Sequence, residues 1–183
     1  NKANNGDLVA IGDTVISPIS VYSKSLKTLS DIKEGGTIAV PNDASNESRA
    51  LYVLKSAGLI KLDVSGQTLA TVKDITSNPK NLVIKELDAS QTARALDSVD
   101  TAVINNNYAV TAGLKKADAI FTEPVNKDSQ QWINIIVANK KDANSSVYKD
   151  VVKAYESEAT KKAIAKAYPD KSTIPAWLSL IHI

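Results

Sequence analysis

Short runs rich in apolar residues, most of them ended by glycine, proline or asparagine, divide the sequence into segments that predict β-strands. The runs are Leu8–Ile11, Val15–Tyr22, Thr37–Val40, Leu82–Leu87, Thr101–Ile104 and Ile133–Ala138. Between them, apolar residues recur at spacings of three and four, which is typical of helices with one buried face. The helices predicted in this way are Leu26–Ile32, Glu47–Ala57, Ala89–Leu96, Tyr108–Leu114 and Ser145–Tyr168. The alternation predicts an α/β fold with a mostly parallel sheet.

Two of the predicted strands end in asparagine-rich loops that lead into predicted helices. The first loop runs from Pro41 to Asn46, and the second is Asn105-Asn-Asn107. In open α/β sheets, ligands bind beyond the carboxyl ends of the strands, where helix N-termini offer unpaired N–H groups. An asparagine amide both donates and accepts hydrogen bonds, which suits a zwitterion with an ammonium and a carboxylate. The two loops therefore form a candidate ligand site.

Arg49 falls in the first turn of the helix predicted at Glu47–Ala57. The helix dipole disfavours a cation there, so an arginine makes better sense if it faces an anion, ideally a carboxylate held by two hydrogen bonds. The alternative is local, because asparagine and serine cluster at helix caps and turns for their own backbone, and a lone arginine is usually solvated. The residues by themselves leave both interpretations open.

Composition narrows the classes of function. The 183 residues are 43% hydrophobic and 23% charged, with a net charge of +2, which gives no electrostatic case for nucleic-acid binding. There is no cysteine, and the single histidine is His182, so neither a metal site nor a cofactor nor a histidine-based triad is expected. Closely spaced carboxylates such as Asp97 and Asp100 keep an acid–base enzyme open as an alternative.

The ends of the chain carry little information on function. No run approaches the roughly 20 apolar residues that span a bilayer. The polar start Asn1–Gly6 lacks a methionine and is interpreted as the start of a fragment or a processed chain. The apolar tail Leu178–Ile183 follows a natural stop at Pro175–Trp177, and we assign no function to it.

Several segments, in register, resemble the NlpA/MetQ family of methionine-binding lipoproteins. Residues Asn42–Leu51 read Asn-Asp-Ala-Ser-Asn-Glu-Ser-Arg-Ala-Leu, which is similar to the family's Asn-Asp-x-Ser-Asn-x-x-Arg-Ala-Leu signature. Pro18–Lys24 resembles the family's first crossover, Leu87–Asn105 its next segment and Gln131–Val137 its returning strand. The resemblance runs in order along almost the whole chain.

The resemblance implies a two-lobed periplasmic-binding-protein-like fold that closes on its ligand. It implies an extracytoplasmic protein, lipid-anchored to the cell membrane, that delivers methionine or a related amino acid to the permease of an ABC importer. A protein of this kind is not an enzyme. Carried over residue by residue, Arg49 pairs with the ligand carboxylate, Asn105 and Asn134 bind the amino-acid head group, and Asn46 is a further candidate beside Arg49.

The resemblance also implies how the chain divides. Residues 21–118 form one complete lobe, whereas 1–20 and 119–183 form part of a second lobe. Family members carry a segment upstream of the position of Asn1, with the lipidated cysteine, a strand–helix unit and an aromatic-rich loop that reads the ligand side chain. Because a lobe without that unit exposes its core, the fragment is expected to swap segments, dimerise or bind ligand poorly.

Two other classes of function stay open beside the solute-binding protein. One is a surface interaction protein that kept the fold and lost the ligand, which an empty or blocked site near Arg49 would favour. The other is an enzyme on a similar two-lobed scaffold, which a cleft residue with a strongly shifted pKa would favour.

Overall fold

The computed structural model describes residues 4–64 and 68–177, and the chain falls into two compact units. The first unit combines Asn1–Ser17 with Val125–Ile183, and the second unit is Pro18–Pro124. The predicted boundaries at 21 and 118 lie inside the second unit, because the strands at both of its ends pair in one sheet. The tail that we left without a function, together with His182, lies outside the described residues.

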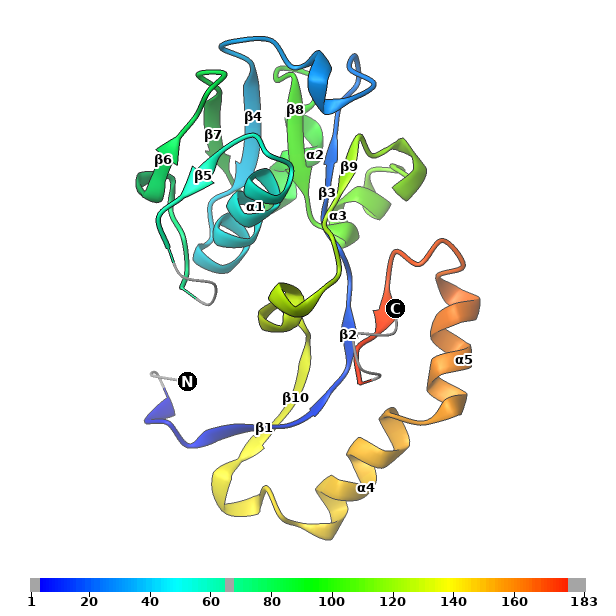
Figure 1. The fold of residues 1–183 in the computed structure, drawn as a ribbon. Coiled ribbons are helices and arrows are strands. Elements are labelled where there is room, and N and C mark those ends of the chain that lie inside the picture. The colour runs from blue at the N-terminus through cyan, green and yellow to red at the C-terminus, as the bar shows by residue number, and fades with distance from the viewer. Residues whose placement is uncertain (1–3, 65–67, 178–183) are drawn as a thin grey trace. The chain divides into compact units, whose positions relative to one another are not determined.

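The second unit is built on a five-stranded mixed sheet (Figure 1). In spatial order its strands are β7 (Val83–Leu87), β4 (Thr37–Pro41), β8 (Thr101–Ile104), β3 (Ser20–Tyr22) and β9 (Phe121–Thr122). Strands β7, β4 and β8 run parallel, but β3 runs antiparallel to both β8 and β9. The prediction of a mostly parallel sheet is therefore wrong for this side, since an apolar run looks the same whichever way its neighbour points.

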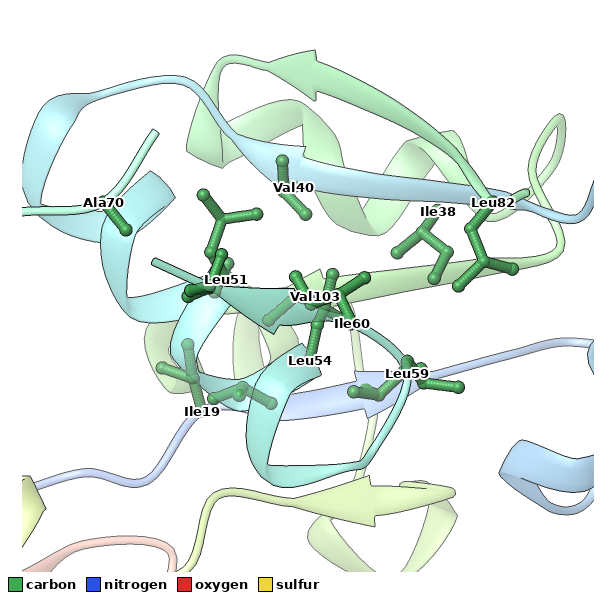
Figure 2. Packing of buried hydrophobic residues seen from close by; sticks show 14 of the residues in the cluster. Ile19, Ile38, Val40, Leu51, Leu54, Leu59, Ile60, Ala70, Leu82 and Val103 are labelled. Atoms are coloured by element: carbon green, nitrogen blue, oxygen red, sulfur yellow. The ribbon is translucent and has the colours of Figure 1, made fainter. Parts of the chain in front are cut away.

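Helices cover both faces of this sheet, as the fully buried strands require. Helix α1 (Ala44–Ser56) packs on the face to which Ile38 and Val103 point, and Figure 2 shows Leu51 and Leu54 of α1 gathered with them. Both leucines are completely buried, which stabilises the fold by about 1.5–3 kcal/mol each. The short helices α2 (Thr92–Ala95) and α3 (Asn106–Thr111) pack on the other face, where Ala39 leaves room for them.

Smaller elements complete the second unit. The antiparallel pair β5 (Lys61–Leu62) and β6 (Ile75–Ser77) adds Leu62 and Ile75 to the cluster around α1. Short 3-10 helices lie at Leu29–Asp31, Val72–Asp74, Ala89–Gln91 and Lys116–Asp118. The helix predicted at Leu26–Ile32 is thus reduced to a single 3-10 turn. The Asp31 carboxylate explains the turn, because it accepts from the backbone N–H groups of Lys27 and Thr28.

Within its described residues, the first unit contains two antiparallel strand pairs and two α-helices. Strand β1 (Leu8–Asp13) pairs with β10 (Ile135–Asn139), and β2 (Val15–Ile16) pairs with β11 (Ile174–Pro175). Residues Lys127–Trp132 and Lys140–Asp142 form 3-10 helices. The long helix predicted at Ser145–Tyr168 is instead two helices, α4 (Ser146–Tyr155) and α5 (Glu158–Ala167). The side chain of Ser157 caps α5 by accepting from Thr160 N–H at 3.2 Å, which starts a new helix at that point.

The core of the first unit is small. Among its described residues, the buried apolar cluster consists of Ile16, Ile174 and Ala176. Two apolar side chains of β10, Ile135 and Val137, are 47% and 46% exposed. The apolar residues of this unit are therefore covered far less completely than those of the second unit.

Candidate functional site

The two asparagine-rich loops meet at one edge of the sheet in the second unit. Strands β4 and β8 are parallel neighbours, so their carboxyl ends lie side by side, and each strand leads from that edge into a helix. Asn46 lies in the first turn of α1, and Asn105 is the residue before α3. The Asn105 Nδ2 group donates to Asn46 Oδ1 at 2.7 Å. The structure thus brings two of the four predicted ligand residues into direct contact.

Asp43 fixes which way these two amides face. The Nδ2 group of Asn46 donates to both carboxylate oxygens of Asp43, at 3.1 and 3.0 Å. An ionised carboxylate only accepts hydrogen bonds, so Asn46 must turn its NH₂ group toward Asp43 and its oxygen toward Asn105. Asn105 must then donate to that oxygen, and its own Oδ1 is turned away from the pair. We call the series Asp43, Asn46 and Asn105 the amide relay.

Asn105 is not used as a helix cap. It occupies the N-cap position of α3, yet its side chain makes no capping hydrogen bond. Its Oδ1 atom is buried and has no hydrogen-bond partner within the part of the chain that the structure describes. A buried acceptor without a partner costs about 1–3 kcal/mol. For Asn105, the interpretation of asparagine as a helix cap therefore fails, and its side-chain oxygen is left without a partner among the described residues.

Arg49 lies in the second turn of α1 rather than the first. The Asp43 side chain caps the helix by accepting from Asn46 N–H at 3.1 Å, so α1 begins at Ala44, three residues earlier than predicted. The prediction that Arg49 lies in the first turn is therefore wrong, and the helix dipole acts on it only weakly because the dipole effect falls off within the first turn. The expectation that Arg49 faces a carboxylate has to rest on its contacts instead.

Those contacts include a carboxylate of the chain itself. Arg49 Nε lies 3.0 Å from Glu123 Oε1, and Arg49 Nη2 lies 2.6 Å from Glu123 Oε2. The two side chains are only 11% and 6% exposed. Glu123 follows β9, and its Oε2 atom also accepts from the backbone N–H of Ile19 at 3.1 Å. Since Ser20 pairs with both Ile104 and Thr122, Ile19 and Glu123 lie at the same edge of the sheet as Asn105.

Asn134, the fourth predicted ligand residue, belongs to the first unit. It lies just before β10 and is exposed. Its Nδ2 group donates to the Val15 carbonyl oxygen at 3.1 Å, and its own carbonyl oxygen accepts from the Thr14 hydroxyl at 2.7 Å. These contacts join β2 to the segment that leads into β10. The ligand role of Asn134 remains a prediction.

Asp43 and Glu123 are the residues at this edge that sequence reasoning missed. Asp43 stood inside the recognised loop, and its position three residues before Asn46 is the ordinary spacing of a cap. Glu123 offered a fainter signal, as an acidic residue between the apolar run Ile120–Phe121 and Pro124. Its partner lies 74 residues away in sequence, so only the register of β3 and β9 brings the two together.

Besides Glu123, the carboxylate of Glu47 on α1 is buried, and its contacts are structural. Burial raises the pKa of Glu47, and a hydrogen bond from Val72 N–H to its Oε1 atom, at 3.2 Å, opposes that shift. The neighbouring Ser48 hydroxyl accepts from Ala70 N–H at 2.9 Å. Together the two side chains bind the segment at residues 70–72 to the helix. The shifted pKa of Glu47 therefore accompanies a packing contact.

The described residues form neither a metal-binding cluster nor a membrane-spanning helix. Residues 4–64 and 68–177 hold no group of three or more histidine, cysteine, aspartate or glutamate side chains arranged to bind a metal ion. Among the helices of those residues, none has the length and apolar character needed to cross a membrane.

Comparison with known proteins gives one family. Residues 1–177 match the family model described as NlpA lipoprotein. The chain is 41% identical, over 178 residues, to the probable D-methionine-binding lipoprotein MetQ of Haemophilus influenzae. That alignment covers 96% of this chain but 64% of the relative. The chain thus spans less than two thirds of the length of this relative.

Solved structures give the same result. The substrate-binding protein of a methionine transporter from Streptococcus pneumoniae aligns with a TM-score of 0.83 at 52% identity, over 97% of this chain and 71% of that one. A nutrient-binding protein from Burkholderia cenocepacia bound to methionine aligns with a TM-score of 0.83 at 44% identity, over 96% and 73% of the two chains. These likenesses confirm the predicted α/β fold of the substrate-binding-protein type.

Proposed function

The chain belongs to the NlpA lipoprotein family, and on that premise we propose that it is most of an extracytoplasmic solute-binding protein serving an ABC importer. Its ligand is an amino acid, with methionine the first candidate. Names of similar proteins support this ligand, since one is called a D-methionine-binding lipoprotein and another was solved bound to methionine.

One observation carries the proposal beyond family membership. The amide relay leaves Asn105 Oδ1 buried and without a partner in the described chain. An atom in this state gains most from a strong hydrogen-bond donor, and a charge-assisted bond from an ammonium is about twice as strong as a neutral one. The α-ammonium group of an amino acid is such a donor. We therefore assign Asn105 to the amino end of the ligand head group.

The other predicted ligand residues are assigned to the same amino-acid head group. Arg49 binds the ligand carboxylate. Asn46 supports Asn105 by accepting from its Nδ2 group, and it is a further candidate beside Arg49 for contact with the head group. Asn134 of the first unit contributes a further hydrogen bond to the head group.

The proposal includes a location and partners. A lipid anchor holds the protein outside the cytoplasmic membrane, in keeping with the lipoprotein name of the family. The partner in transport is the permease of an ABC importer, which receives the amino acid. Selectivity for the ligand side chain lies with residues other than Asn46, Arg49 and Asn105, because these three address the head group that all amino acids share.

Calorimetric titration of the full-length protein tests the proposal. L-methionine, D-methionine, norleucine and the other common amino acids are titrated in turn. We expect methionine to bind most tightly. Substituting Asn105→Ala should weaken its affinity by about 1–3 kcal/mol, or about 5- to 150-fold, because the ammonium loses its acceptor.

Asn107→Ala is the matched control. This asparagine belongs to the same run but is exposed on α3, and it should bind methionine like the wild type. If no amino acid binds the wild-type protein, the transport proposal is wrong and a surface interaction protein becomes the better interpretation. If Asn105→Ala and Asn107→Ala bind equally well, the head-group site is misplaced.

A further inference from the structure

A tight turn precedes β1 at the start of the described chain. The Asp7 N–H donates to the Asn4 carbonyl oxygen at 2.8 Å, which closes a four-residue turn around Asn5 and Gly6. Asn5 has a φ of 51° and Gly6 a φ of 76°. Two successive residues of positive φ are typical of a type I′ turn, and asparagine followed by glycine is the sequence that favours it. The dipeptide Asn-Gly occurs once in the chain.

Asn5 and Gly6 are open to solvent and weakly held. Both are exposed, and a Cβ atom added to Gly6 would meet no heavy atom within 4 Å. Among the described residues, neither the Asn5 side chain nor the Gly6 N–H has a hydrogen-bond partner. The turn therefore opens at low cost, because few contacts oppose local opening of an exposed segment.

This arrangement allows the chain to modify itself. When the turn opens, the Gly6 backbone nitrogen, after losing its proton to hydroxide, can attack the Asn5 Cγ atom. The new N–C bond closes a five-membered succinimide ring. The Cγ–Nδ2 bond breaks, and the leaving nitrogen takes a proton from water, which releases ammonia and regenerates hydroxide. Water then adds to either carbonyl carbon of the ring and opens it, which leaves aspartate or isoaspartate at position 5.

The identity of the following residue decides whether this attack is easy. Because Gly6 has no Cβ, no side chain hinders the approach of its nitrogen to Cγ. Asn81 has a similar backbone, with a φ of 50°, but Leu82 follows it. The Leu82 N–H donates to Asn78 Oδ1 at 2.9 Å, and Asn81 Nδ2 donates to Glu34 at 2.9 Å. At Asn81, the side-chain amide and the nitrogen that would attack it are therefore both engaged.

We propose that Asn5 is a site of spontaneous covalent modification, at which attack by the Gly6 nitrogen converts the side-chain amide into a carboxylate. The converted chain has one more negative charge, so its net charge falls by one from +2. The site lies at the entry to β1, where the Asp7 carbonyl oxygen accepts from Lys140 N–H at 2.7 Å. Isoaspartate adds a methylene group to the main chain just before this contact, and so weakens the start of the β1–β10 pair.

Peptide mapping of the 183-residue chain, incubated at mildly alkaline pH, tests the modification. Trypsin places Asn5 and Asn81 in different peptides, since lysines lie between them, and mass spectrometry follows the exchange of an amide for a carboxyl group in each. We expect Asn5 to convert at least about tenfold faster than Asn81, whose hydrogen bonds must break first. Aspartate and isoaspartate should both form at position 5, and the rate should rise with pH because the attacking nitrogen must lose its proton.

Gly6→Ala is the matched variant. The added Cβ meets open space, although the positive φ strains an alanine and so loosens the turn. Conversion of Asn5 should nevertheless slow by about tenfold, because a methyl group beside the attacking nitrogen hinders its approach. Faster conversion in this variant would refute the role of Gly6, since opening of the turn alone would then set the rate.

Two other results would overturn the modification itself. One is conversion of Asn5 no faster than that of Asn81. The other is aspartate without isoaspartate at position 5, because direct hydrolysis of the side chain by water gives aspartate alone.

Hydrogen exchange tests the effect on β1. Ion exchange separates the converted chain by its extra negative charge. In the isoaspartate form, the Lys140 N–H should exchange at least about threefold faster than in the unconverted chain. The Asp63 N–H, which donates to the Asp74 carbonyl oxygen at 3.0 Å in the second unit, should keep its rate. Equal Lys140 rates in the two forms would overturn the weakening of the β1–β10 pair.

Discussion

Substituting Asp43→Asn tests whether the amide relay orients Asn105. Asparagine caps a helix about as well as aspartate, so α1 and the free energy of unfolding should change by less than about 0.5 kcal/mol. The variant removes only the requirement that Asn46 point its NH₂ group at the side chain of residue 43, because an amide accepts and donates whereas a carboxylate only accepts. Stability and orientation are thereby separated in one substitution.

The expected loss of methionine affinity follows from the populations of the two orientations of the Asn46 amide. In the wild type, reversing the Asn46 amide forfeits its hydrogen bonds to the Asp43 carboxylate, at 3.0 and 3.1 Å. A hydrogen bond to a charged group contributes about 1.5–3 kcal/mol, so the reversed state is populated at about 10% or less. In the Asp43→Asn variant the two states become comparable, and apparent affinity falls by the fraction that remains competent. We expect methionine to bind about twofold more weakly.

Calorimetry with two ligands and urea denaturation complete the test. The α-hydroxy analogue of methionine lacks the ammonium, so its affinity should change little in Asp43→Asn. Asp31→Asn is the control, because Asp31 also accepts from local backbone N–H groups but lies in the connection that leads to the other end of β4. An unchanged methionine affinity in Asp43→Asn, with the fold intact, would refute the orienting role. So would an equal loss for both ligands.

Two further predictions concern stability. Burial raises the pKa of Glu47 above its ordinary 4.5, so the free energy of unfolding should fall as pH rises through the folded-state pKa. Glu47→Gln should remove this pH dependence and stabilise the chain at pH 7, as measured by urea denaturation. Hydrogen bonds from Thr37, first its backbone N–H at 2.6 Å, hold the pKa of Asp100 below 3.8. The stabilisation from Asp100 should be present above about pH 4 and should be lost as pH falls through the folded-state pKa. Asp100→Asn should cost about 1–2 kcal/mol at pH 7, and the difference from the wild type should shrink as pH falls through that pKa.

The parts of the fold that could be predicted are those specified by local pattern. The strand Thr37–Val40, the polar loop after it and the amphipathic helix around Leu51 and Leu54 were predicted together, because burial of one helix face sets the spacing of apolar residues. Their extents differ from the prediction by only a few residues, and the Asp43 cap accounts for the main difference. The same local logic placed Asn105 at the start of a helix.

The parts that failed depend on contacts distant in sequence or on single polar atoms. The direction of β3 is set by where the chain enters the second unit, which the apolar run at residues 15–22 does not record. The break between α4 and α5 depends on one Ser157 hydroxyl that caps the second helix. The pairing of Arg49 with Glu123 depends on the registers of β3 and β9. In each case the deciding interaction leaves no periodic signal.

The missed residues change how the candidate site should be understood. Sequence reasoning treated Arg49 and Asn105 as groups waiting for a zwitterion, whereas the structure gives each an internal carboxylate at the end of its contacts: Glu123 for Arg49, and Asp43 through Asn46 for Asn105. A group that is already oriented loses little conformational freedom when a ligand arrives. Both carboxylates belong to the second unit, so Arg49 and Asn105 are each oriented by a carboxylate of their own unit. Under the proposed function, two of the head-group residues are thus oriented before the ligand arrives, and Asn134 of the first unit adds to them.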